Sequence, residues 1–320
     1  MKNDFESFYN SINQDEMRIH WEEARKEKKR KTKIAIILIL IIDLTIIWIV
    51  SRQIGGFNTS EFGIFPWIAM FIPIIVIDII IFAITSLIFS KNTIKYNDVF
   101  KEKVINSIFE NFLYDVDYIP KKQMPQDIYK EGKYDGYYNR YYSDDYLEAI
   151  IDNKYNIKMA EITTEHVETT TDSDGDTHTE TTTIFSGLFA KINIGKSINS
   201  ELRIKQNGTL FKKNKLEMDS QEFEKYFDVI STNQIIGMQL LTHDIMDILV
   251  DFRIQLKMPL DILIREDIMY IRLHTGKMFE TTINNKSILD RKTIEKYFNI
   301  VNFIYSLSKK MIKVVEETQI

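Results

Sequence analysis

The stretch from Ile34 to Val50 reads IAIILILIIDLTIIWIV, and the stretch from Ile64 to Phe89 reads IFPWIAMFIPIIVIDIIIFAITSLIF. A helix that crosses a bilayer needs about 20 mostly apolar residues, roughly 17 to 25, so the first stretch is just long enough and the second has room to tilt. Only residues 51–63 separate the two stretches. The sequence therefore predicts a two-helix transmembrane hairpin over residues 34–90, with helices at 34–50 and 64–89 and an outer turn at 51–63.

Positive charge is concentrated on one side of this hairpin. A basic cluster precedes the first apolar stretch and consists of Arg25, Lys26, Lys28, Lys29, Arg30, Lys31 and Lys33. The turn, by contrast, carries only Arg52. Segments rich in Lys and Arg stay in the cytoplasm, so we expect a two-pass plasma-membrane protein with both termini cytoplasmic. A cleaved signal peptide is disfavoured, because the basic stretch is too long and the apolar stretch starts too far along the chain.

The residues before the hairpin have a pattern of their own. Phe5, Ile12 and Ile19 recur every seven residues, which predicts that residues 1–33 form a basic amphipathic cytoplasmic helix running into the first apolar stretch. Such a narrow apolar stripe suits packing against the chain's own domain or a coiled-coil seam. We expect the basic cluster to contact anionic lipid headgroups, at about 1 kcal/mol for each Lys or Arg.

Composition excludes several classes of function. The chain has 320 residues, a formal net charge of -5 and no cysteine. A general nucleic-acid binder needs clustered positive charge on its binding face, so we expect no nucleic-acid partner. Without cysteine there is no disulfide framework, thiolate metal site or cysteine nucleophile. The five histidines do not fall at ligand spacing, so we expect no metal. The sequence has no dinucleotide fingerprint and no kinase-like set of motifs, so we expect no cofactor.

The remainder, residues 91–320, predicts a cytoplasmic α+β domain in which helices flank an antiparallel sheet. A helix is predicted over 97–114. Residues 115–146 look irregular, and we expect their tyrosines to cover the sheet. Strands rich in β-branched residues follow over 154–194, with a two-residue turn at Asp174-Gly175.

The rest of this domain alternates between the two kinds of element. The patterns predict helices at 220–227, 243–252 and 288–315, strands at 229–231 and 277–283, and a hairpin of 260–265 with 268–274. Thr242 is the expected N-cap of the second of these helices.

Two acidic motifs resemble sites but lack the residues that a site needs. Asp172, Asp174 and Asp176 imitate the opening of a calcium loop, yet Thr177 and Thr183 stand where its glycine and glutamate belong, so a hairpin turn is favoured. Asp144 and Asp145 are adjacent carboxylates, but neighbours in sequence usually point apart, and no partner acid or base is identifiable. We therefore assign no catalytic residue, and the chain is more simply read as a protein without enzymatic activity.

Each apolar stretch carries one aspartate near its middle, Asp43 and Asp78. At 1.5 Å per residue they lie about 15 and 19 Å from the cytoplasmic ends of their helices, so they can meet in an antiparallel hairpin. Two carboxyls in a low dielectric do not both ionise, so at least one stays protonated and can donate to the other. We interpret them as an intramembrane polar pair that locks the hairpin or joins protomers. The alternatives are a proton or ion pathway and two tolerated aspartates without a role.

Several short motifs resemble a known family. They are FESFYN at Phe5–Asn10, AEI at Ala160–Ile162, IFSGLF at Ile184–Phe189, LEMDSQEFEKYFDVISTNQ at Leu216–Gln234, and Leu241-Thr242. On these motifs the chain resembles a bacterial family of two-pass membrane proteins known as domain of unknown function 3137. The resemblance implies the same hairpin and soluble domain, and it implies no activity.

These observations favour a membrane-anchored cytoplasmic interaction or scaffold module. Its expected partners are the lipid bilayer and a further protein, and a homo-oligomer is left open. The alternative is a small membrane sensor or transport accessory whose intramembrane aspartates titrate. A third option is an enzyme acting on lipid or peptide at the membrane surface.

Overall fold

The computed structural model describes residues 4–12, 14–54, 79–80, 83, 97–133, 136–172, 174–208, 215–280 and 290–318. The chain divides into two compact units. The first comprises residues 1–12, 101–280 and 291–320, and the second comprises residues 13–100 and 281–290.

In the second unit the main described element is the 41-residue helix α2, Gln14–Ile54. It runs without interruption through the basic cluster and the first apolar stretch, which confirms the predicted continuity between them. The prediction of a single helix over residues 1–33 is wrong, because a separate helix ends at Ser11 and Ile12 is extended. Asp78 and most of the second apolar stretch lie outside the described residues. Within the part of the chain that is described, no helix has both the length and the apolar character required to cross a membrane.

The first unit is built on a nine-stranded sheet in which every paired neighbour is antiparallel. The strands are β1 (Tyr114–Ile119), β2 (Arg140–Ile151), β3 (Tyr155–Thr171), β4 (Thr177–Asn193), β5 (Glu201–Gln206), β6 (Lys215–Leu216), β7 (Phe227–Ser231), β8 (Leu260–Arg265) and β9 (Ile268–Leu273). Their order across the sheet is β1-β2-β3-β4-β9-β8-β5-β7-β6. The predicted α+β class with an antiparallel sheet is thus confirmed.

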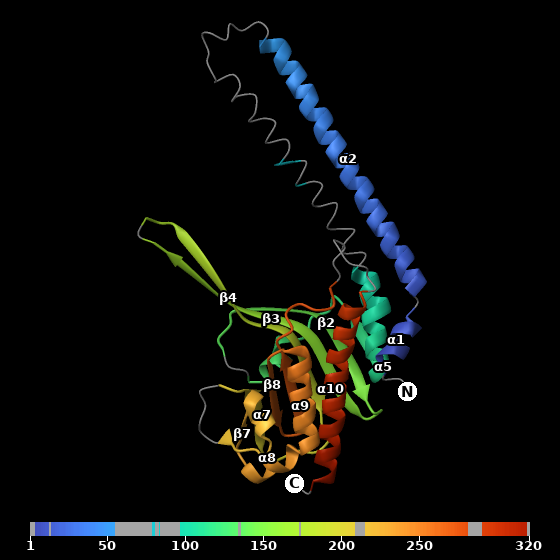
Figure 1. Cartoon of the computed structure of the whole chain (residues 1–320). Helices are drawn as coiled ribbons and strands as arrows, with labels where there is room; N and C mark the ends of the chain where they lie inside the picture. Colours follow the sequence, from blue (N-terminus) through green and yellow to red (C-terminus); the bar gives the residue numbers. More distant parts are fainter. Residues whose placement is uncertain are drawn as a thin grey trace. The chain divides into compact units, whose positions relative to one another are not determined.

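Helices cover one face of this sheet. They are α1 (Phe5–Ser11), the π-helical turn η1 (Lys101–Ile105), α5 (Asn106–Phe112), α7 (Gln221–Tyr226), α8 (Gln234–Leu240), α9 (His243–Leu256) and α10 (Arg291–Glu317). The long helix α10 packs against α9, α5, α8 and α1, and it lies beside α9 in Figure 1. Its apolar stripe supplies much of the core, including Phe298, Ile304 and Leu307, each nearly fully buried.

The opposite face is covered by the segment that looked irregular in sequence. Its short helix α6 (Gln126–Lys130) places Tyr129 in a cluster with Phe185 and Phe189, against which Tyr138 and Tyr141 also pack. The expectation that the tyrosines cover the sheet is confirmed for these rings. The expectation of irregular structure is wrong for β1, α6 and the first half of β2, which fall inside 115–146, and it is confirmed for residues 120–125 and 136–139.

Most of the later elements lie where the patterns predict. The helix that begins at His243 has Thr242 at its N-cap position, although the threonine side chain makes no capping hydrogen bond. The strand expected from residue 277 is wrong over 277–280, which are irregular, and residues 281–289 lie outside the described part. Met278 and Phe279 are buried there, so their apolar character reflects packing rather than strand pairing.

Strands β3 and β4 continue past the sheet as a two-stranded arm, defined here as residues 165–183 and visible as a projection in Figure 1. The arm ends in a five-residue loop, 172–176, rather than the predicted two-residue turn. The Asp172 side chain explains the wider loop, because its Oδ1 accepts hydrogen bonds from the backbone of Asp174 and Asp176. His166 pairs with Thr182 and His178 pairs with Thr170, so the two histidines are not cross-strand partners.

Candidate functional site: a buried carboxylate cluster

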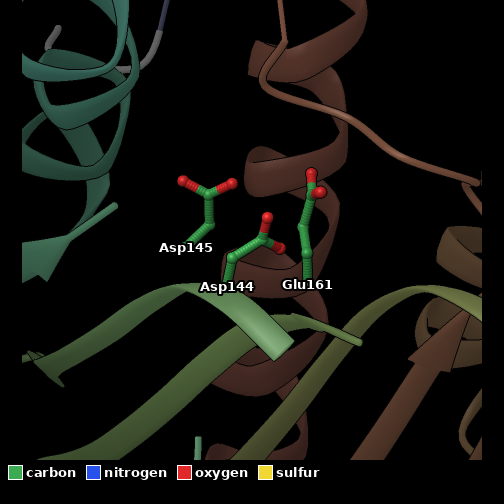
Figure 2. Close-up of side chains that lie close together, drawn as sticks. All are labelled: Asp144, Asp145 and Glu161. Carbon is green, nitrogen blue, oxygen red and sulfur yellow. The ribbon is translucent and has the colours of Figure 1, made fainter. Parts of the chain in front are cut away.

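A β-bulge in β2 creates the most unusual group of polar side chains in the described residues. The pairing of β2 with β3 is regular up to Asp144 and resumes at Leu147, with a shift of register between them. Asp145 takes up this shift with a φ of 54°, in the left-handed region that aspartate tolerates. Because a bulge re-aims side chains, Asp144 and Asp145 both project from the same face of the sheet (Figure 2). The expectation that they point apart is therefore wrong.

A third carboxylate joins them from the neighbouring strand. Glu161 of β3 is the direct cross-strand partner of Asp144. One carboxylate oxygen from each of Asp144, Asp145 and Glu161 lies within 4.8 Å of the others. Like charges placed directly opposite each other destabilise a sheet, so this arrangement needs a compensating proton or cation.

One positive charge reaches the cluster from the helical side. Lys101 of η1 donates from Nζ to Asp145 Oδ2 at 2.6 Å and to Glu280 Oε1 at 3.2 Å. The Tyr118 hydroxyl of β1 donates to the other oxygen of Asp145. Both oxygens of Asp145 thus have partners, and the residue is only 1% exposed.

Glu161 is less well satisfied. Its Oε1 accepts the backbone N–H of Met278 at 2.8 Å. Its Oε2 is shielded from solvent and has no hydrogen-bond partner among the described residues. The Met278 backbone thus holds one oxygen of Glu161 in place, and the other oxygen has no donor among the described residues.

The pKa values of the cluster follow from burial and mutual repulsion. Burial, with the charges of Asp145 and Asp144, raises the pKa of Glu161 to about 9. Burial raises the pKa of Asp145 to about 6, although Lys101 and Tyr118 act in the opposite direction. The pKa of Asp144 is also raised by burial, against the influence of Lys101 and Lys277. At neutral pH and without a bound cation, the cluster therefore holds at least one proton, on Glu161.

On the other face of the sheet, Arg272 and Asp261 form an ion pair that differs from the cluster, because each charge has a partner of opposite sign. Arg272 donates through Nε to Asp261 Oδ2 at 3.0 Å, and its guanidinium lies 5.1 Å from the centre of the Phe185 ring. Burial opposes ionisation of Asp261, but His274 and Arg272 outweigh it and lower the pKa of Asp261 to about 2. This pair matches charge with charge, and we interpret it as structural.

A groove of about 740 Å³ lies between α9, α10 and the turn after β2. Four lysines line it, and each has an acidic partner, although Asp244 and Glu317, the partners of Lys310 and Lys313, are not among the lining residues. Lys154 bonds Glu316 at 2.8 Å, and Lys309 bonds Asp152 at 3.1 Å. The groove therefore has no strong charge of one sign to specify a ligand.

The sites predicted from sequence lie elsewhere. The basic cluster occupies the N-terminal half of α2, where its side chains are exposed or half-buried. Asp43 lies on the same helix, half-buried, with an Oδ1 that has no hydrogen-bond partner among the described residues. Since Asp78 is outside those residues, the predicted Asp43–Asp78 pair stays a prediction.

Glu161, Lys101 and Tyr118 were missed as site residues, although a signal was present for one of them. Ile157, Met159 and Glu161 alternate along β3, so they share one face of the strand. The first two are core residues, which makes Glu161 a charge at a core-facing position. No comparable signal marks Lys101 or Tyr118, since their proximity to Asp145 depends on the tertiary fold.

Comparison with known proteins adds one match. The model of a family described as "Protein of unknown function (DUF3137)" matches residues 183–313. The matched region begins in β4 and ends in α10, so it includes the IFSGLF and LEMDSQEFEKYFDVISTNQ motifs but not Asp144, Asp145 or Glu161. No curated protein and no solved structure matches the chain.

Proposed function

We propose that the chain is a membrane-tethered interaction module, in which the apolar part of the second unit enters the bilayer and the α+β domain binds a protein partner. The observation that carries the proposal is the exposure of apolar side chains along α2. Large apolar residues exposed by about half or more recur throughout its C-terminal half: Ile34, Ile36, Ile37, Leu38, Leu40, Ile41, Leu44, Trp48 and Ile49.

These residues surround the helix rather than lining one stripe. A helix that is apolar all round is stable only inside a large core or in a membrane. Leu44 is 65% exposed and Trp48 is 58% exposed, so the described residues provide no such core. A bilayer supplies the missing apolar environment, and the indole of Trp48 suits the headgroup region.

The basic cluster supports the sidedness of the proposal. Positively charged flanks remain in the cytoplasm, and the anionic inner leaflet of the plasma membrane attracts them. Both termini, and the α+β domain with them, would then be cytoplasmic.

The arm supports the interaction role. Residues 165–183 contain six carboxylates and no Lys or Arg. At the base of the arm Glu165 still pairs with Arg140, and the Asn139 side chain bonds the backbone of Val167. From residue 168 onward the described arm residues pair only across the ribbon, so the outer edges of this part are open to a further strand. Charge complementarity favours a basic segment of a partner protein.

Membrane topology can be tested directly, because the chain has no cysteine of its own. A Ser60→Cys variant should react with a membrane-impermeant maleimide on intact cells. A Thr318→Cys variant should react only after permeabilisation. Labelling of Thr318→Cys on intact cells, or recovery of the wild-type chain in the soluble fraction after lysis, would refute the proposal.

The interaction role needs a separate test. A photo-crosslinking amino acid at Thr169, on the arm, should give a partner adduct in cells. The adduct should disappear in the double variant Glu168→Lys, Glu180→Lys, while the same crosslinker at Ser306 on α10 serves as a control position. An adduct that survives the charge reversal would argue against recognition of the arm by a basic segment.

A second candidate is a membrane sensor in which Asp43 titrates. The Oδ1 of Asp43, which has no hydrogen-bond partner among the described residues, favours it, because an ionisable residue inside a membrane is often functional. Comparing Asp43→Asn with wild type across a pH series would distinguish the two candidates. The interaction module predicts the same crosslinking in both proteins at every pH, and the sensor predicts a pH dependence that the variant lacks.

A further inference from the structure

The carboxylate cluster contains a buried oxygen that the fold leaves unsatisfied. Glu161 is 4% exposed, and its Oε2 has no hydrogen-bond partner among the described residues. Nearly all buried polar groups in proteins have a partner, so an exception calls for a proton, a water or an ion. The Glu161 carboxylate projects from the sheet on the same side as those of Asp144 and Asp145 (Figure 2).

We propose that Asp144, Asp145 and Glu161 bind one hard divalent cation, with Ca²⁺ the best fit. Carboxylate oxygens are the ligands that Ca²⁺ and Mg²⁺ prefer. One oxygen from each residue lies within 4.8 Å of the others. Oxygens this close together can share one ion, and Ca²⁺ accepts an irregular arrangement of ligands, whereas Mg²⁺ demands a near-ideal octahedron.

The surroundings allow such an ion to enter and to complete its coordination. Asp144 is only half-buried, so one side of the cluster remains accessible to water. Calcium takes six to eight oxygen ligands, which three carboxylates and several waters can provide. The cation would also remove the repulsion between the cross-strand partners Asp144 and Glu161.

Lys101 already supplies a positive charge to the cluster, so its bond to Asp145 would have to weaken when a cation binds. Its Nζ bonds Asp145 and also Glu280, which is exposed. Lys101 can therefore keep Glu280 as its partner when Asp145 turns one oxygen to a cation. The geometry makes the lysine ammonium a competitor for the cation, with one positive charge against the three carboxylates.

This competition gives two variants with opposite expected effects. In calorimetric titrations of the full chain in detergent with Ca²⁺, Glu161→Gln should weaken binding by about tenfold or more, because it removes a ligand that becomes a carboxylate when the cation displaces its proton. Lys101→Met should tighten binding, because it removes the competing charge. Glu165→Gln is the matched control, since it makes the same change on the same strand at a residue paired with Arg140 outside the cluster.

Thermal unfolding supplies a second readout that does not depend on heat of binding. Lys101→Met should lose stability without divalent cation and regain most of it with Ca²⁺, whereas the double variant with Glu161→Gln should not respond. Mg²⁺ should act in the same direction at higher concentration. If Ca²⁺ and Mg²⁺ change neither the wild type nor Lys101→Met, the proposal is overturned and a proton alone satisfies Glu161. A response of equal size in Glu161→Gln would overturn it as well.

Discussion

At the scale of single residues, Glu161 places an ionisable side chain at a buried position where the fold otherwise has apolar residues. Its neighbours on the same strand face, Ile157 and Met159, bury apolar surface as the sheet requires. Glu161 instead brings a carboxyl to the same layer, opposite Asp144. Such a group is tolerated only in its neutral form or beside a positive charge.

This position makes stability depend on pH when divalent cations are chelated. Glu161 has a pKa of about 9 in the folded chain and an ordinary pKa of 4.5 when unfolded. Its contribution to stability is fully present below the unfolded value and is lost as pH rises through the folded value, because the unfolded chain releases the proton first. We expect the free energy of unfolding to fall by a few kcal/mol between about pH 5 and pH 9.

The substitution Glu161→Gln should flatten this slope, since an amide is neutral at every pH and still accepts the Met278 N–H. Chemical denaturation at several pH values with a chelator present measures the effect. Glu165→Gln should keep the wild-type slope, and an equally steep slope in Glu161→Gln would show that another group is responsible.

Gly187 in the IFSGLF motif illustrates a steric requirement. A Cβ at this position would overlap the carbonyl oxygen of Leu273 and lie 2.7 Å from the backbone nitrogen of Thr275. Backbone atoms of β9 cannot move aside as a flexible side chain does. Only glycine allows β4 and β9 to approach this closely.

We therefore expect Gly187→Ala to destabilise the α+β domain by about 3 kcal/mol or more, as overpacking against backbone does. The neighbouring change Ser186→Ala should cost about 1 kcal/mol or less, because it removes only a long hydrogen bond of 3.3 Å to Thr163. Urea unfolding of the two variants gives the comparison, and similar midpoints would contradict the steric argument.

At the scale of elements, the arm is a two-stranded ribbon without a core. An isolated hairpin is marginally stable in water, so its loop and cross-strand contacts matter. The Asp172 side chain closes the loop through two backbone hydrogen bonds. Thr169 and Thr179 also meet across the ribbon with their hydroxyls 3.3 Å apart.

Removing this loop closure should open the arm without unfolding the domain. Asp172→Ala loses both hydrogen bonds, and we expect amide exchange over 165–183 to accelerate by about tenfold or more while the rest of the sheet keeps its protection. Asp174→Ala is the matched control, because its backbone N–H still reaches Asp172. Unchanged exchange in Asp172→Ala would show that strand pairing alone holds the arm.

The elements also show where pattern reading succeeds. Segments with a clear period, such as α10 and the β8–β9 hairpin, lie within a few residues of the predicted bounds. The wrong predictions concern segments whose structure is determined by tertiary contacts rather than by local sequence pattern. β2 looked irregular because its tyrosines and acids hide the alternation, and residues 277–280 are apolar for burial rather than pairing. The carboxylate cluster depends on a bulge and on a lysine far away in sequence, so adjacency of Asp144 and Asp145 alone gave the wrong expectation.

At the scale of the whole molecule, the two units differ in how far their apolar residues are exposed. The sheet domain buries them between its helices and strands, whereas α2 leaves them exposed. Asp43 lies in this exposed apolar stretch. If the proposed hairpin forms, Asp43 and Asp78 are the polar groups available to hold its helices together or to join two copies.

Replacing both aspartates by leucine should therefore weaken assembly in detergent, even though leucine is the better residue for insertion. Size-exclusion chromatography with light scattering and thermal unfolding measure oligomeric state and stability. The double change Ile41→Leu, Ile80→Leu controls for substitution in the same stretches. Unchanged size and stability in the aspartate variant would refute a locking role.

The order of strands has a consequence for the protein's synthesis. The free edge of β4 is covered only when β9 pairs with it, and β9 begins about 75 residues after β4 ends. A ribosome adds about 5 to 20 residues each second, so a nascent chain would carry this open strand for roughly 4 to 15 seconds before its partner is translated. During that interval the growing polypeptide is exposed to misassociation with other nascent chains, and a chaperone that shields β-edges would be most useful then.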